Sequence, residues 1–277
     1  MLALLLVETL VGSSASAVII AQDNFNGVDA ALINADSTVV GGPWVGSSGY
    51  TYGSNHLLSA TTGSGHVLGI NKGAGFFIDN PDLYELSADV FFNSTSANTR
   101  LYTVGFTLGN NTSSGANRTH LATTTSSAAL SGQPTIALRA DGVVTVADGN
   151  GSIFSGALAG YADDNIYSIR LRLDTTTVNW TVNASVYDYT NSTETFLDLN
   201  GIAAGLTYTY ATNPTIQYVG ISSNVTAADQ ANSYMDNFLF QTVVIPEPST
   251  YALIFAGLAG LALCRCRIRP WFQFPGN

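Results

Sequence analysis

The spacing of apolar residues constrains the fold of this chain most. Along its middle, apolar and polar residues alternate with period two in short runs, and turn-forming residues separate the runs. Such runs are typical of half-buried β-strands. The clearest ones are Leu83–Phe92, Leu101–Leu108, Thr135–Arg139, Val143–Ala147, Ile166–Asp174, Val178–Tyr189, Ile216–Ser222 and Tyr234–Val243. Because no sustained helical period occurs before the C-terminal segment, the sequence predicts an all-β domain.

Two turns fix how neighbouring runs fold back on one another. Ala140-Asp141-Gly142 favours a hairpin, because Asp-Gly suits a type I′ turn, and the three threonines at 175–177 turn the run that ends at Asp174 back into the run that follows. After that reversal, Val178, Trp180 and Val182 share one face, and polar residues share the other. One buried face and one wet face are typical of a β-sandwich. We therefore expect Trp180 to lie in the core.

Composition limits the partners and the number of domains. Only 10% of residues are charged, and the formal net charge is −10. Nucleic acid is excluded as a partner, because no basic surface is available to neutralise phosphates. No linker or repeat divides residues 18–244, so we expect one domain there, with a long loop at 116–132.

The N-terminus has the pattern of a secretory signal peptide. An apolar run at 1–7 precedes Ala15-Ser16-Ala17, which fits a small-x-small cleavage site. Glu8 interrupts the apolar run, and no basic residue comes before it. We predict a signal peptide at 1–17, and the alternative is a buried first strand of the domain.

The C-terminus has the pattern of a stop-transfer element. Pro246, Glu247 and Pro248 precede an apolar run at 251–264, and a basic cluster follows. That cluster consists of Arg265, Arg267 and Arg269. Basic flanks stay on the cytoplasmic side of a membrane. The run would extend about 21 Å as a helix, against a hydrocarbon core of about 30 Å, so a temporary hold suits it better than permanent anchoring.

In these three elements and their order, residues 245–269 resemble the PEP-CTERM sorting signal of Gram-negative bacteria that make extracellular polysaccharide. The resemblance implies recognition of Pro246, Glu247 and Pro248 by an exosortase, a membrane cysteine transpeptidase. It also implies a transient stay in the inner membrane, followed by release to the cell surface or extracellular matrix. The tail at 270–277 departs from the pattern, and an ordinary single-span anchor is the alternative.

The region between the two ends resembles the concanavalin A-like, or laminin-G-like, jelly-roll domains. The resemblance rests on Asp23-Asn24-Phe25 near the start, Asp236-Asn237-Phe238 near the end, and the runs at 138–146 and 167–174. It implies an all-β fold, an antiparallel jelly-roll β-sandwich, followed here by a short C-terminal transmembrane helix.

Catalytic patterns are weak. Glucanases of this fold use a Glu-x-Asp-x-x-Glu strand, whereas Glu85 and Glu194 are far apart and lie in no such pattern. Asp82, Glu85 and Asp89 are close in sequence, but we interpret them as a solvent-facing strand edge. There is no Gly-x-Ser-x-Gly, and Cys occurs only after residue 263. We expect no enzyme, and the alternative is a glycan hydrolase or lyase that uses unrecognised Asp residues.

Calcium is the one ion that the resemblance suggests, and no cofactor is required. Jelly rolls of this kind often hold calcium where the first and last strands run side by side, and Asp23 and Asp236 offer hard oxygen ligands there. The alternative is that both carboxylates cap strand ends or turns. His56 and His66 lack the short spacing of a zinc site.

Sugar binding is the function that the aromatic residues favour. Trp44, Tyr50 and Tyr52 lie in a Gly- and Ser-rich stretch, with Asn55 close by. Pyranose faces stack on aromatic rings, and sugar hydroxyls need amide or carboxylate partners. Buried loop anchors would give the same pattern. The sequence thus predicts an exported, non-catalytic structural or adhesive module that binds extracellular polysaccharide.

Overall fold

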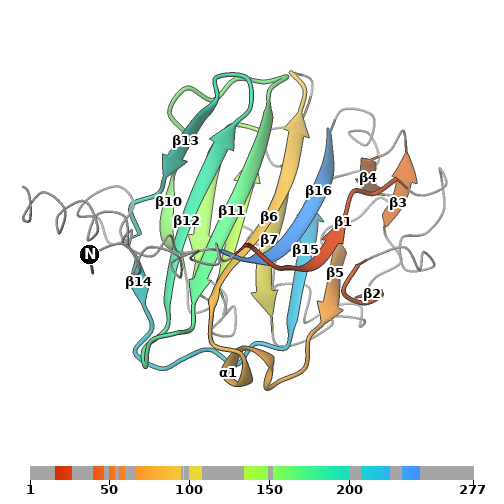
Figure 1. The fold of residues 1–277 in the computed structure, drawn as a ribbon. Coiled ribbons are helices and arrows are strands. Elements are labelled where there is room, and N and C mark those ends of the chain that lie inside the picture. The colour runs from red at the N-terminus through yellow and green to blue at the C-terminus, as the bar shows by residue number, and fades with distance from the viewer. Residues whose placement is uncertain are drawn as a thin grey trace, which may run out of the picture. The chain divides into compact units, whose positions relative to one another are not determined.

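Two antiparallel β-sheets lie face to face in the computed structural model of the protein (Figure 1). The structure describes residues 16–26, 40–46, 50–53, 56–59, 66–94, 96, 100–107, 134–148, 152–199, 207–224 and 233–243. The chain divides into one unit at Met1–Val243 and a second at Val244–Asn277. All of the described residues belong to the first unit.

The sheet nearest the viewer in Figure 1 is nine-stranded and follows the order β13-β12-β11-β6-β16-β4-β3, with β1 paired to β16 and β14 to β12. We call it sheet A. Its strands are β1 (Ile19–Asp23), β3 (Tyr50–Gly53), β4 (His56–Ser59), β6 (Leu83–Phe92), β11 (Ile166–Asp174), β12 (Thr181–Asp188), β13 (Thr193–Phe196), β14 (Tyr208–Thr209) and β16 (Ser233–Thr242).

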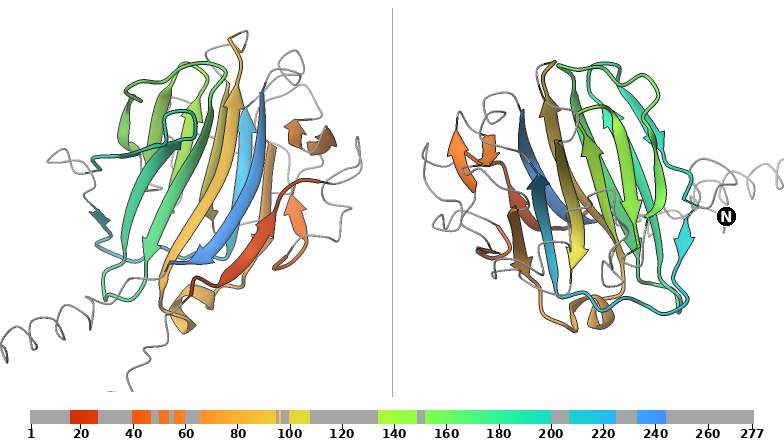
Figure 2. Two further views of the ribbon diagram at one scale, coloured as in Figure 1. Left: turned by 45° about the horizontal axis from the view of Figure 1, so that its top comes forward. Right: turned by 180° about the vertical axis from the view of Figure 1, so that it is seen from behind.

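The second sheet, which we call sheet B, is nearest the viewer in the right-hand panel of Figure 2. It is seven-stranded, in the order β10-β9-β8-β7-β15-β5-β2. Its strands are β2 (Trp44–Gly46), β5 (His66–Asn71), β7 (Leu101–Thr107), β8 (Thr135–Arg139), β9 (Val143–Ala147), β10 (Ser152–Ala157) and β15 (Tyr218–Asn224). A single helical turn, α1 (Phe76–Asp79), joins β5 of this sheet to β6 of sheet A.

The order of the strands confirms the predicted antiparallel jelly-roll sandwich. The chain crosses between the sheets several times, among them from β5 to β6, from β6 to β7, from β14 to β15 and from β15 to β16. These crossovers place the last strands beside earlier ones, so that β16 pairs with β6 and β15 pairs with β7. The first and last strands also pair, with Asp23 opposite Phe238.

Strand β6 shows why the period-two pattern folds this way. Its inward residues are at most 1% exposed and are Tyr84, Leu86, Ala88, Val90 and Phe92. They join one hydrophobic core cluster that also contains residues of β7, β11, β12 and β16. Because side chains alternate between the two faces of a strand, the residues between them point outward.

The turn at 140–142 forms the predicted hairpin, but its geometry differs from the prediction. Strands β8 and β9 pair antiparallel around it. Gly142 has a φ of 77°, whereas Asp141 is not among the described residues with positive φ. A type I′ turn needs positive φ at both central residues, so the type I′ prediction is wrong.

The sequence predicts that Val178, Trp180 and Val182 share a buried face, and this is correct for two of the three residues. Trp180 is 5% exposed and Val182 is fully buried, whereas Val178 is 92% exposed. The strand begins only at Thr181, because the reversal extends through residue 179. Val178 therefore belongs to the turn and not to the inward face of the strand.

Several predictions concern residues outside the described ranges. They include nearly all of the signal peptide at 1–17, the loop at 116–132, the sorting signal at 245–269 and the tail at 270–277. Among the helices that the structure does describe, none has the length and apolar character needed to cross a membrane.

Candidate functional site

Charged side chains are concentrated on the outer face of sheet A. On β6, the outward residues Glu85, Ser87 and Asp89 are only 9%, 6% and 7% exposed. Strand β6 lies inside the sheet, with β11 on one side and β16 on the other. The prediction that these carboxylates mark a solvent-facing strand edge is therefore wrong.

One half of this face contains two glutamates, Glu85 and Glu194, that form ion pairs with Arg170 and Arg172. We call it the arginine half. Arg172 Nε donates to Glu85 Oε2 at 2.6 Å. Glu194 Oε1 lies 3.4 Å from Arg170 Nη1 and 3.5 Å from Arg172 Nη2, and it accepts a hydrogen bond from Ser185 Oγ at 2.7 Å. Each glutamate charge is thus balanced by a neighbouring guanidinium.

The two arginines also lie against aromatic rings. The Arg170 guanidinium is 4.8 Å from the centroid of the Tyr187 ring, and that of Arg172 is 5.9 Å from the Phe196 ring. Cation–π contacts of this kind hold a guanidinium in place beside its carboxylate partners. In the arginine half, each of these charged side chains therefore has an oppositely charged partner, and both guanidinium groups also lie against an aromatic ring.

The other half, which we call the aspartate half, places two carboxylates opposite each other. Asp89 of β6 and Asp236 of β16 are direct partners in the strand register. The Tyr189 hydroxyl donates to Asp89 Oδ1 at 3.2 Å, and Asn237 Nδ2 donates to Asp89 Oδ2 at 2.9 Å. His56 Nδ1 lies 3.2 Å from Asp236 Oδ2. Among the described residues, no lysine or arginine forms an ion pair with either aspartate.

A β-bulge builds this half of the face. The register between β16 and β6 shifts between Asp236 and Leu239, and Asn237 has a φ of 48°. Its backbone N–H donates to Asp236 Oδ1 at 2.8 Å. Bulges re-aim side chains, and positive φ at a non-glycine residue stores strain that surrounding contacts must hold. Here the bulge turns the Asn237 amide toward Asp89.

Stacked rings lie beside the two carboxylates. The His56 and Tyr234 rings are 3.9 Å apart and nearly parallel, at 8°, and Tyr234 stacks on Phe91 at 4.8 Å and 15°. The His56 side chain is 31% exposed and that of Asp236 is 18% exposed. The stack therefore reaches the surface next to partly exposed carboxylate oxygens.

Burial changes the ionisation of this half. It raises the pKa of the Asp236 carboxyl, and the charge of Asp89 acts in the same direction, against the hydrogen bond from Asn237 and the nearby His56. Burial also raises the pKa of the Tyr234 hydroxyl, and Asp236 and Asp89 add to that effect. Negative charge is thus costly here and lacks a fixed cationic partner.

The structure does not support Trp44 as a sugar platform. Trp44 is 2% exposed and packs against Phe25 and Phe238, at ring distances of 6.2 and 4.8 Å. Its Nε1–H donates to Asp23 Oδ2 at 2.7 Å. A ring buried on both faces offers no surface to a pyranose, so this prediction is wrong.

The remaining residues of that predicted site are only partly described. The stretch expected to be loop-like forms β2 and β3 instead. Tyr50 and Tyr52 lie in β3, but the structure describes only their backbone, and Asn55 lies outside the described residues.

The predicted calcium pair is not brought together. Strands β1 and β16 run side by side as expected. Asp23, however, is 7% exposed on the core side, where Oδ1 accepts the N–H of Phe25 at 2.7 Å, while Asp236 faces outward beside His56. The two carboxylates project from opposite faces of the sheet and do not fit one calcium ion. In the described part of the chain, no group of three His, Cys, Asp or Glu could hold a metal.

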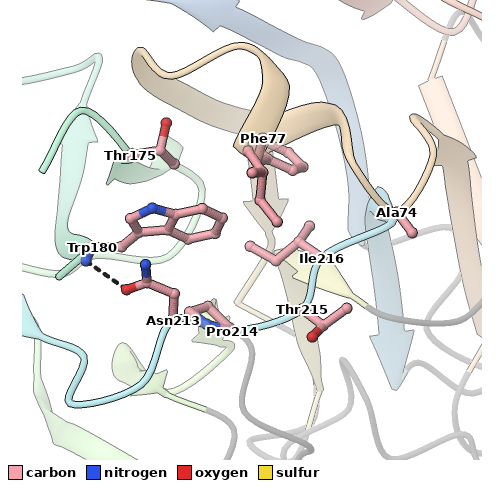
Figure 3. A pocket seen from close by; sticks show the side chains of 9 residues that line it. Ala74, Phe77, Thr175, Trp180, Asn213, Pro214, Thr215 and Ile216 are labelled. Atoms are coloured by element: carbon pink, nitrogen blue, oxygen red, sulfur yellow. Dashed lines mark hydrogen bonds between the residues drawn. The ribbon is translucent and has the colours of Figure 1, made fainter. Parts of the chain in front are cut away.

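A cavity of about 280 Å³ opens near α1, at one end of the sandwich (Figure 3). Phe77, Trp180 and Ile216 form its apolar part. Asn213 Oδ1 accepts the backbone N–H of Trp180 at 2.8 Å, and Asn213 Nδ2 donates to the Val178 carbonyl at 2.9 Å. Because this amide already holds the chain in place, the cavity is less suited to a hydroxyl-rich ligand than the aspartate half.

Comparison with known protein families identifies the C-terminal segment. Residues 244–267 match the PEP-CTERM protein-sorting motif, as the sequence predicted. The chain therefore carries a PEP-CTERM sorting motif, and an antiparallel jelly-roll sandwich precedes the motif in the sequence. The motif implies exosortase-dependent export to the cell surface. The comparison with curated proteins found no match to the chain.

Solved structures with a similar fold include lectins. Peanut lectin is 10% identical, with a TM-score of 0.47, and the match covers 83% of this chain and 99% of that chain. Lectin II from Ulex europaeus is 10% identical, with a TM-score of 0.42, and the coverage is 71% and 87%. A protein of unknown function from Shewanella oneidensis is 12% identical, with a TM-score of 0.44, and the coverage is 84% and 90%.

Proposed function

We propose that this exported protein is a non-catalytic, polysaccharide-binding module of the cell surface or extracellular matrix. The observation that carries the proposal is the stack of Phe91, Tyr234 and His56 beside Asp89 and Asp236. Rings that reach the surface can stack on pyranose faces, and neighbouring carboxylates and amides can bind sugar hydroxyls. The binding surface is thus the aspartate half of sheet A.

The proposal includes the route to the surface. A signal peptide at 1–17 directs secretion, and the apolar segment after residue 250 holds the chain in the inner membrane. The exosortase then recognises Pro246, Glu247 and Pro248 and processes the chain, with the arginines at 265–269 on the cytoplasmic side. The match of the sorting motif at 244–267 supports this order of events.

A specific feature favours glycan hydrolysis as a second candidate. Asp89 and Asp236 are direct cross-strand partners, and the Cβ atoms of such partners are about 5 Å apart, so both carboxyl groups project from the same part of the sheet. Retaining glycosidases use carboxyl groups about 5–5.5 Å apart, one of which has a raised pKa. Asp236, whose pKa is raised, would be the acid, and Asp89 would be the nucleophile.

Glycan-panel binding by the full chain, purified in detergent, tests the proposal. Reducing-sugar release is followed in the same samples. We expect binding without release. Tyr234→Ala should weaken binding about fivefold or more, because it removes the ring that holds His56 and Phe91 in the stack, and ring stacking contributes about 1 kcal/mol beyond area burial.

Ile78→Ala is the control, because Ile78 is 70% exposed on α1, away from the stack. If the chain binds no glycan, or if Tyr234→Ala and Ile78→Ala lose the same glycan affinity, the proposed surface is contradicted. Sugar release that Asp236→Asn abolishes would favour the hydrolase instead.

A further inference from the structure

We propose that the aspartate half of sheet A selects polysaccharides that carry free amino groups, as in de-N-acetylated hexosamine polymers. This inference rests on the proposed function, because it names the class of glycan that the same surface binds. It follows from the juxtaposition of two aspartates, which have no lysine or arginine partner among the described residues, with a partly exposed aromatic stack.

Charge on the outer face is distributed unevenly. Glu85 and Glu194 each have a guanidinium within 3.5 Å. In the described part of the chain, the partners of Asp89 and Asp236 are hydrogen-bond donors and His56, with no lysine or arginine. The face therefore has one neutral half and one negative half.

The register makes the negative half a site that favours a cation. Like charges directly opposite each other on neighbouring strands are unfavourable. An ammonium group between Asp89 and Asp236 would remove that repulsion and would gain charge-assisted hydrogen bonds. The raised pKa of Asp236 agrees with a carboxylate that lacks such a partner.

The aromatic stack favours a sugar ammonium over a bare cation. Tyr234 lies flat between Phe91 and His56, so its own faces are covered, and the stack presents the partly exposed His56 ring beside the carboxylates. A hexosamine has an apolar ring face for stacking, hydroxyls for the exposed Asn237 amide, and an ammonium for the aspartates. Uronic acid polymers would be repelled by the same two charges.

Paired oligosaccharides that differ only in N-acetylation test the inference. The full chain in detergent is titrated calorimetrically with a glucosamine tetramer and an N-acetylglucosamine tetramer. The buffer is near neutral, so that the aspartates are ionised and a large share of the amines is protonated. We expect the free-amine tetramer to bind about tenfold tighter, as charge-assisted hydrogen bonds require. Asp236→Asn and Asp89→Asn should each remove most of that preference.

Asp79→Asn is the matched control, because it removes the same charge from an exposed position on α1. The chain has a net charge of −10, so a general attraction for polycations must be separated from a site. The melting temperature of every variant, measured by circular dichroism, checks that the fold is retained. If Asp79→Asn and Asp236→Asn lose the same share of the preference for the free-amine tetramer, the inference is overturned.

The remaining outcomes distinguish the inference from the function on which it rests. Equal binding of both tetramers, weakened by Tyr234→Ala, would overturn the amine preference and leave polysaccharide binding intact. Binding of neither tetramer, nor of any other glycan, would overturn both. A lysine tetrapeptide that binds as tightly as the glucosamine tetramer would assign the site to cationic peptides instead.

Discussion

Trp44 shows how a single residue can satisfy two opposite interpretations. Its neighbours in the sequence are glycines, serines and tyrosines, which suit an exposed sugar platform as well as a buried anchor. The structure decides between them through Asp23, whose carboxylate accepts the indole N–H inside the core. No sequence pattern links two residues that meet only after β1 and β2 are in place.

Trp44→Phe should destabilise the fold without affecting glycan binding. The smaller ring leaves Asp23 Oδ2 without its indole donor, and losing a buried hydrogen bond to a charged group costs about 1–3 kcal/mol. Urea unfolding of the full chain measures the change. Trp180→Phe is the control, since among the described contacts the Trp180 side chain makes no hydrogen bond. A loss of glycan binding in Trp44→Phe would return this residue to the binding site.

The hairpin between β8 and β9 depends on a glycine for two separable reasons. Gly142 has a φ of 77°, and a Cβ added there would lie 2.5 Å from Tyr161 Cγ. Gly160 has a φ of 75°, but a Cβ there would meet nothing within 4 Å. Both positions therefore need a residue that tolerates positive φ, but only at Gly142 would an added Cβ also clash with a neighbouring side chain.

Gly142→Ala should lower stability more than Gly160→Ala. Both variants incur about 1 kcal/mol for placing a side chain at positive φ. Only Gly142→Ala must also displace the Tyr161 ring, so we expect an additional loss of about 1–3 kcal/mol from overpacking. Thermal melts of the two variants measure the difference. Equal melting temperatures would show that Tyr161 moves aside freely.

The sequence predicts individual strands well where alternation is regular. The predicted ranges Leu83–Phe92, Val143–Ala147 and Ile166–Asp174 agree with β6, β9 and β11. It fails where a turn continues in strand-like residues, as at Val178, because β-branched residues occur in both settings. It also misses short strands such as β2, since three residues carry too little periodicity.

The candidate site is a property of the sheet and could not be derived from any one strand. Glu85, Ser87 and Asp89 alternate with apolar residues, which signals a polar outer face on β6. The hydrogen-bond partners of Glu85 and Asp89 come from β11, from β16 and from Tyr189 just after β12, up to 156 positions away in the sequence. Register decides that Asp89 meets Asp236, and register depends on the pairing of distant strands.

The sandwich should unfold in a single transition. Trp44 of the edge strand β2 and Trp180, which directly precedes β12 of the other sheet, belong to one core cluster. With Trp271→Phe as background, tryptophan fluorescence and far-ultraviolet circular dichroism should give coincident urea midpoints, as expected for two-state unfolding. Midpoints that differ between the two probes would show that the two sheets come apart in steps.

The position of β16 in sheet A also determines when the fold can be completed. This last strand lies between β6 and β1, and residues 238–241 pair with the first strand of the domain. A chain that emerges from its N-terminus cannot close sheet A until residue 242 has followed. Long-range pairing of this kind is slow to form. The sandwich thus reaches its final topology only when the chain has emerged as far as residue 242, just before the sorting motif begins at residue 244.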